Sequence, residues 1–170
     1  GPMIALPLWH RLAASTALTL RSVSRERGAW LDDMTNACTA ATTVLGMVFD
    51  HAGVEARLAS GFRKSRRHRD VHCWAQVAGR IVDITATQFG ENAIVFCLPV
   101  PSSIYQPFEV IDMAALSRGL RNDWPHNLEH PAHPRQRHAV IAETFARVVG
   151  MPLSRARRVT TATIGAEVRP

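Results

Sequence analysis

With 170 residues, the chain is long enough to bury one hydrophobic core, and its apolar fraction of 46% excludes wholesale disorder. No apolar run approaches the roughly 20 residues that a membrane-spanning helix needs, so we expect no membrane as a partner. The net charge of +6 comes mostly from arginines and is compatible with binding to nucleic acids or acidic surfaces.

The first third of the chain predicts two helices. Apolar residues recur at helical spacing over residues 7–23, and a polar stretch follows. A second helix is expected to start near Thr35, where Asp33, Thr35 or Asn36 could cap it, and Gly53 ends it. Its apolar stripe is formed by Ala37, Ala41, Val44, Leu45, Val48 and Phe49.

The middle third predicts strands. Short apolar segments cover residues 54–62, 71–77, 80–85 and 93–98. Ala78 and Gly79 separate the second of these strands from the third and are typical of a hairpin turn. A connection broken by prolines follows over residues 99–107.

The last third predicts helices again. Asp112 could cap a short helix that ends at Leu120. Residues 122–134 are rich in Pro and His, as expected of a loop, and residues 135–149 form a helix that Gly150 ends. The order of helix, helix, strands and helix indicates an α+β fold.

The chain is expected to hold one domain. We interpret residues 1–3 as the remnant of a cleaved tag, residues 4–153 as the domain, and residues 154–170 as a basic, flexible tail. The segment after the remnant is interrupted by His10 and Arg11, which makes a poor core for a signal peptide. A cytoplasmic location is therefore the default expectation.

The three cysteines are Cys38, Cys73 and Cys97, an odd number that cannot all pair within one chain. Their spacing is too wide for a CxxC metal or redox motif, and a sparse set of this kind fits a reducing compartment. A buried structural role is the simplest interpretation for Cys73 and Cys97. Cys38 is the thiol whose position suggests chemistry.

The predicted hairpin brings a histidine close to an aspartate. Alternate residues of a strand share a face, so His72 and Trp74 lie opposite the apolar core face and point into solvent or a cleft. A two-residue turn pairs Val77 with Arg80, which places Trp74 opposite Asp83. His72 and Asp83 are then diagonal neighbours on one face, whereas a three-residue turn would separate them. An ordinary surface ion pair is the competing explanation.

Cys38 supplies a third group. It lies in the first turn of the second predicted helix, where N–H groups and the positive end of the helix dipole stabilise a thiolate. A thiol in this position has a lowered pKa, more so beside an imidazolium. Cys38 would then be the nucleophile, His72 the base and later the acid, and Asp83 the residue that orients His72.

The segment from Cys38 to Phe89 resembles the transglutaminase-like branch of the papain-like cysteine enzymes. The family has a helix-borne Cys, a strand reading roughly His-Ala-Trp-Val-Glu-Val, and a neighbouring strand ending in Val-Asp-x-Thr. The corresponding runs in this chain are His72-Cys73-Trp74-Ala75-Gln76-Val77 and Val82-Asp83-Ile84-Thr85. The chain departs from the pattern at Thr39, where the family usually has Trp, and its His–Asp interval is shorter than in many members.

This resemblance implies a papain-like, transglutaminase-like fold, in which a nucleophile helix packs on an antiparallel sheet that bears His72 and Asp83. It implies an enzyme whose Cys38 attacks a peptide or glutamine amide and forms a thioester, which water or an amine resolves. A peptidase, a glutamine deamidase and a transamidase share this first step, and all three stay open. The expected partner is a protein or peptide substrate, without a cofactor. A secreted effector and a cytoplasmic processing enzyme would both fit.

An enzyme of this kind needs hydrogen-bond donors for the developing oxyanion. The backbone N–H of Cys38 is one, and Asn36 or Trp30 could add a side-chain donor, although Asn36 could equally cap the helix. Trp74 could form a wall of the cleft or cover an edge of the core. Gln88 could add a polar wall.

Arginines cluster over residues 63–69 and again over 155–158. Through Arg66, Arg67 and Arg69, the first cluster could steer an acidic protein or peptide substrate to the cleft. The alternative function is a non-catalytic basic module that binds nucleic acid or an acidic protein. No aromatic residues are interleaved with the cluster, so nucleic acid is the less favoured partner.

Four histidines invite a metal-site interpretation: His126, His130, His133 and His138. Prolines interrupt their spacing, so one regular helix cannot align the whole set, and no carboxylate or thiol completes a recognisable pattern. We therefore expect exposed loop histidines and no metal.

Overall fold

The computed structural model describes residues 5–30, 32–113 and 134–167. Its helices are α1 (Leu8–Arg27), α2 (Cys38–His51), the short 3-10 helix η1 (Ala86–Phe89), α4 (Pro134–Val149) and α5 (Leu153–Ile164). Its strands are β1 (Arg57–Lys64), β2 (Arg69–Val77), β3 (Arg80–Asp83), β4 (Phe96–Pro99) and β5 (Tyr105–Asp112). They form one antiparallel sheet in the order β4-β3-β2-β1-β5, which confirms the α+β class.

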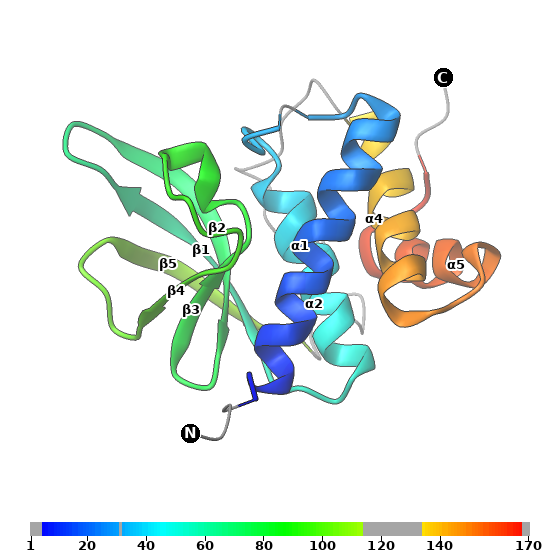
Figure 1. The fold of residues 1–170 in the computed structure, drawn as a ribbon, viewed down its shortest axis with the longest axis horizontal. Coiled ribbons are helices and arrows are strands. Elements are labelled where there is room, and N and C mark those ends of the chain that lie inside the picture. Colours follow the sequence, from blue (N-terminus) through cyan, green and yellow to red (C-terminus); the bar gives the residue numbers. More distant parts are fainter. Residues whose placement is uncertain (1–4, 31, 114–133, 168–170) are drawn as a thin grey trace.

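The elements form three layers, with α1 and α2 between the sheet and the pair α4 and α5 (Figure 1). Because α2 consists of small and apolar residues, it can be buried on all sides, and residues 38–49 are all buried. Leu45 and Phe49 belong to the apolar cluster that α1 and α2 share with the sheet. Val44 and Val48 belong to a second cluster with α4 and α5. The residues of the predicted stripe are all buried, but burial extends around the whole helix instead of along one face.

The start of α2 differs from the prediction. Met34 and Asn36 have φ of 65° and 66°, which a right-handed helix does not accommodate. The helix therefore begins at Cys38, with Ala37 at the N-cap and no described side chain capping it. Asp33 closes the preceding turn instead, because its Oδ1 accepts hydrogen bonds from the N–H and the hydroxyl of Thr35.

Two further helices correct the sequence interpretation. Helix α1 continues through the polar stretch to Arg27 and ends at Gly28, whose φ of 61° is left-handed. Residues 154–164, expected in a flexible tail, belong to α5, which buries Ala156 and Thr160. Helix α4 confirms the helix predicted at 135–149. None of the helices in the described residues is long and apolar enough to cross a membrane.

Strand β5 corrects the prediction of a proline-broken connection over residues 99–107, because the strand begins within that range at Tyr105. Residues 105–112 pair antiparallel with β1, and Asp112 ends the strand. Pro107 is tolerated because β5 lies at the edge of the sheet, where an N–H need not enter a ladder on both sides. The helix predicted to end at Leu120 and the predicted loop fall mostly within residues 114–133, which lie outside the described residues.

Candidate active site

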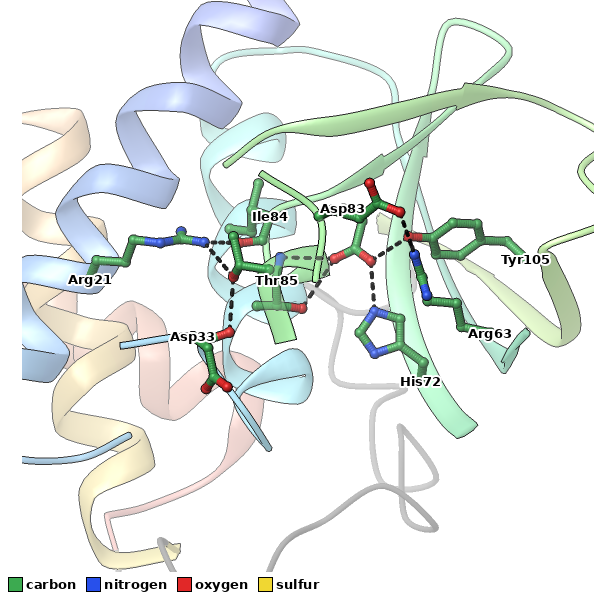
Figure 2. A network of polar contacts seen from close by, with 10 residues as sticks. Arg21, Asp33, Arg63, His72, Asp83, Ile84, Thr85 and Tyr105 are labelled. Atoms are coloured by element: carbon green, nitrogen blue, oxygen red, sulfur yellow. Dashed lines mark hydrogen bonds and ion pairs between the residues drawn. The ribbon is translucent and has the colours of Figure 1, made fainter. Parts of the chain in front are cut away.

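The hairpin formed by β2 and β3 has the predicted two-residue turn. Val77 pairs with Arg80, and residues 78 and 79 have φ of 51° and 71°. Left-handed conformations at both central positions are typical of a type I′ turn, whose twist matches that of the flanking strands. His72 and Asp83 consequently share a face, and His72 Nε2 lies 2.8 Å from Asp83 Oδ2 (Figure 2).

The face that carries His72 is buried, which corrects the expectation that it points into solvent or a cleft. His72 and Trp74 are each 1% exposed. An apolar cluster covers this face and consists of Ala59, Trp74, Ile81 and Tyr105, with Phe96 and Leu98 packed against it. Trp74 is thus a core residue of this cluster rather than a cleft wall, and its ring stacks on His72 with 6.2 Å between centroids.

Asp83 accepts four hydrogen bonds. Its Oδ1 accepts from the Thr85 N–H at 2.9 Å and from the Thr85 hydroxyl at 3.1 Å. Its Oδ2 accepts from the Tyr105 hydroxyl at 2.8 Å in addition to His72. Burial acts to raise the pKa of Asp83, but the charge of His72 and these hydrogen bonds lower it below its usual value. Asp83 is therefore a fixed carboxylate that orients the ring of His72.

Cys38 is the first residue of α2 and is 7% exposed. Helix α2 packs against β2, and there Cys38 contacts Cys73 and His72. The hydrogen bond with Cys73 is the largest influence on the pKa of Cys38. Together with the hydrogen bond and the positive charge of His72, it holds this pKa well below its usual range, although burial acts in the opposite direction.

The pKa values of the His72 imidazole and the Cys73 thiol are shifted in the opposite direction, upward. Burial acts to lower the pKa of His72, but Asp83 and then Cys38 outweigh it and raise this pKa to about 10. Burial and the neighbouring Cys38 raise the pKa of Cys73 well above its usual value, so Cys73 stays a thiol. These pKa shifts favour a thiolate at Cys38 and an imidazolium at His72, whose Nε2 is bonded to Asp83. Because Nε2 faces Asp83, Nδ1 is the ring nitrogen left for Cys38.

Three residues of this site were not predicted to belong to it. Thr85 follows Asp83 by two positions, a spacing at which an aspartate often bonds the local backbone, so a local signal existed. Cys73 lies on the sheet face that α2 covers, which the strand alternation already indicated. Tyr105, the chain's only tyrosine, had no local signal because strand β5 itself was missed.

The side chains predicted as possible oxyanion donors or cleft walls lie in different surroundings. Asn36 is exposed in the turn before α2, and Trp30 packs against the clusters around α1 and α2. The Gln88 Nε2 atom is buried and has no hydrogen-bond partner among the described residues. Its neighbours in η1 have partners: Thr87 donates to the Asp33 carbonyl, and Phe89 contacts His72 edge-on. Gln88 is therefore next in sequence to a residue that contacts His72.

The first arginine cluster divides into exposed and buried members. Arg66 and Arg67 lie in the turn between β1 and β2, Arg69 begins β2, and all three are exposed. Arg63 lies within β1 and is only 4% exposed, so it is not part of a solvated loop. The second cluster, residues 155–158, lies in α5.

In the part of the chain that the structure describes, no group of three or more His, Cys, Asp or Glu side chains could hold a metal ion. His126, His130 and His133 lie outside that part. His138 is described and is not an exposed loop histidine: it lies buried in α4, with Nε2 3.0 Å from Thr161 Oγ1.

Comparisons with models of protein families, with curated proteins and with solved structures find no match for this chain. The geometry of Cys38, His72 and Asp83 is therefore the basis of the functional proposal.

Proposed function

We propose that this protein is a cysteine-nucleophile enzyme that acts on an amide bond of a protein or peptide through a thioester intermediate. The observation that carries the proposal is the 2.8 Å contact between His72 Nε2 and the buried Asp83, with Cys38 close enough to His72 for each to shift the pKa of the other. An activated thiol at a helix start, a titratable ring beside it and a third group that orients the ring form the arrangement used in nucleophilic catalysis.

In the proposed first half-reaction, the Cys38 sulfur attacks the amide carbonyl carbon, and the carbonyl oxygen becomes an oxyanion. The backbone N–H of Cys38 is the first donor to this oxyanion. When the C–N bond breaks, His72 passes its proton to the leaving amine or ammonia, and an acyl thioester remains on Cys38. Water or an incoming amine then attacks the thioester while His72 accepts a proton, and the thiolate is regenerated.

A papain-like, transglutaminase-like architecture is part of the proposal. It is supported by a nucleophile at the start of α2, by the packing of α2 on an antiparallel sheet, and by adjacent strands that carry His72 and Asp83. Peptidase, glutamine deamidase and transamidase activities share the first half-reaction, so the triad supports all three equally. The exposed Arg66, Arg67 and Arg69 support an acidic substrate.

The test is site-resolved alkylation of the native protein with iodoacetamide from pH 5 to 9, read by mass spectrometry at each cysteine. Cys97 is an internal control, because burial raises the pKa of its thiol. We expect Cys38 to react well below the pH near 8.5 at which a free thiol titrates. We also expect this advantage to disappear in His72→Ala. If Cys38 in the folded protein is inert or reacts as an ordinary thiol, the proposal is wrong, and binding to nucleic acid or an acidic protein becomes the hypothesis to test.

A further inference from the structure

Arg63 is a cation in the interior of the molecule. It is 4% exposed, although its neighbours in the arginine-rich hairpin are exposed. Its Nη2 donates to Glu91 Oε1 at 3.0 Å, and its guanidinium lies 4.3 Å from the centroid of the Phe89 ring. Burying a guanidinium is unfavourable unless partners compensate its charge. A strand does not require an arginine at this position, since other side chains could occupy it. The position therefore calls for a role beyond charge on the surface.

The contacts of Arg63 connect it to the triad along two paths. On one path, Arg63 Nε donates to the Tyr105 hydroxyl at 3.2 Å, and this hydroxyl donates to Asp83 Oδ2 at 2.8 Å (Figure 2). On the other path, Phe89, on which Arg63 stacks, meets the His72 ring edge-on at 4.8 Å and 89°. His72 and Asp83 close the cycle, so five side chains from five elements form one ring of contacts.

The hydrogen-bonding chemistry gives this cycle a direction. Arg63 has donors only, so the Tyr105 oxygen must accept from it. A phenol has a single proton, which Tyr105 therefore directs to Asp83 Oδ2, the same oxygen that faces His72. Burial and Asp83 raise the pKa of Tyr105 far above its usual value, so its hydroxyl keeps this proton.

We propose that Arg63 and Tyr105 are positioning residues of the active site, which fix the Asp83 carboxylate in its ionised form and thereby hold His72 against Cys38. This inference rests on the proposed function, since it assigns residues that act through Asp83 on the same nucleophile. Neither residue touches the reacting atoms. Both favour the form of the Asp83–His72 contact in which Asp83 carries the negative charge and His72 carries the proton.

The test compares the pH dependence of Cys38 alkylation in Tyr105→Phe, Arg63→Met, Arg63→Lys and the matched control Arg57→Met. Arg57 lies on the same strand and the same face of β1 as Arg63 but is exposed. Loss of a hydrogen bond to a charged carboxylate moves a titration by about one pH unit or more. We expect the acid limb of Cys38 reactivity to move upward by about one pH unit in Tyr105→Phe and Arg63→Met. In Arg63→Lys, which keeps a charged donor, the acid limb should lie closer to its wild-type pH. In Arg57→Met, the acid limb should lie at its wild-type pH.

A residue needed only for packing would lower the melting temperature without moving this limb. An unchanged limb in folded Tyr105→Phe therefore overturns the inference while the proposed function stands. An ordinary Cys38 thiol in the wild type overturns the proposed function and, with it, this inference. If Arg63→Met does not fold, Tyr105→Phe decides, because it removes one oxygen atom and keeps the ring.

Discussion

His72 Nε2 and Asp83 Oδ2 lie 2.8 Å apart, and each side chain is 1% exposed. The diagonal relationship of these residues across a two-residue turn produces this contact, and the apolar cluster that contains Trp74 and Tyr105 removes it from water. A buried pair of opposite charges is sensitive to the loss of either partner, because the remaining charge is left without compensation. The contact therefore sets both the reactivity expected of Cys38 and the pH response expected of the fold.

Asp83→Asn should reduce the reactivity of Cys38. The substitution keeps the size of the side chain but removes the charge that stabilises the His72 imidazolium. A hydrogen bond to a charged group contributes about 1.5–3 kcal/mol, so we expect Cys38 alkylation at pH 6 to slow by roughly 10- to 100-fold. The measurement is the alkylation rate of folded protein, with the exposed Asp70→Asn on β2 as the control. Equal rates in Asp83→Asn and wild type would contradict the assigned role.

Cys73→Ala should raise the pKa of Cys38. The Cys73 hydrogen bond is the largest influence that lowers this pKa, and alanine cannot supply it. We expect the midpoint of Cys38 alkylation to shift to higher pH by about one unit, a typical effect of one lost hydrogen bond to a charged group. Cys73→Ser keeps a donor and should shift the midpoint less, while Cys97→Ala should leave it in place. A midpoint that does not respond to Cys73→Ala would show that His72 alone activates the thiol.

Cys38→Ala should uncover a loss of stability with rising pH. His72 titrates near 6.5 when unfolded and near 10 when folded, so between these values the folded state binds the extra proton and its stabilisation declines as pH rises. Cys38 acts oppositely, because its folded pKa lies well below its usual value and its contribution to stability grows with pH. In the wild type the two changes offset each other from pH 6.5 toward 9.

Without the Cys38 thiol, only the pH-dependent contribution of His72 to stability remains, because Asp83 still raises the pKa of His72. We expect the unfolding free energy of Cys38→Ala to fall over this window by at most about 1.4 kcal/mol per pH unit. Urea denaturation at several pH values measures it, and the double variant Cys38→Ala/His72→Gln is the control without the slope. A flat profile in the single variant would indicate a neutral His72 in the folded protein.

Ala78→Asn should stabilise the fold without changing the chemistry. Ala78 has φ of 51°, a left-handed conformation that alanine disfavours by roughly 1–2 kcal/mol and asparagine tolerates better. A gain of about 1 kcal/mol corresponds to an increase of roughly 2–4 °C in melting temperature for a domain of this size. Gly79→Ala should have the opposite effect, since residue 79 has φ of 71°. Thermal unfolding checks both variants, and a lower melting temperature of Ala78→Asn would contradict the type I′ assignment.

Neutralising Arg66, Arg67 and Arg69 together should slow turnover of an acidic peptide amide, and the effect should be larger at low ionic strength. These side chains are exposed, and exposed charges act at a distance mainly when salt does not screen them. The measurement is kcat/KM for a glutamine peptide with acidic flanks and for its neutral counterpart, at low and at physiological salt. The neutral peptide should be unaffected. An equal rate for the acidic peptide at low salt would remove the steering role.

The central pair of the site could be predicted from the sequence because its geometry is local. Strand alternation and a two-residue turn are enough to make His72 and Asp83 neighbours, since both lie within one hairpin. The position of Cys38 at a helix start was also evident from the chain, although the sequence suggested the wrong capping residues and a start too early.

The tertiary structure alone decided which other groups surround this pair. Tyr105 reaches Asp83 because β5 pairs with β1. No local sequence pattern predicted this edge strand, which contains Pro107. Arg63 belongs to a run of charges that is typical of a solvated loop, yet it lies inside because Tyr105, Phe89 and Glu91 compensate it. The sequence by itself therefore determined the place of Cys38 at a helix start and the pairing of His72 with Asp83, because both follow from local periodicity. Long-range pairing of strands and helices decided the burial, charge and hydrogen bonds that tune them.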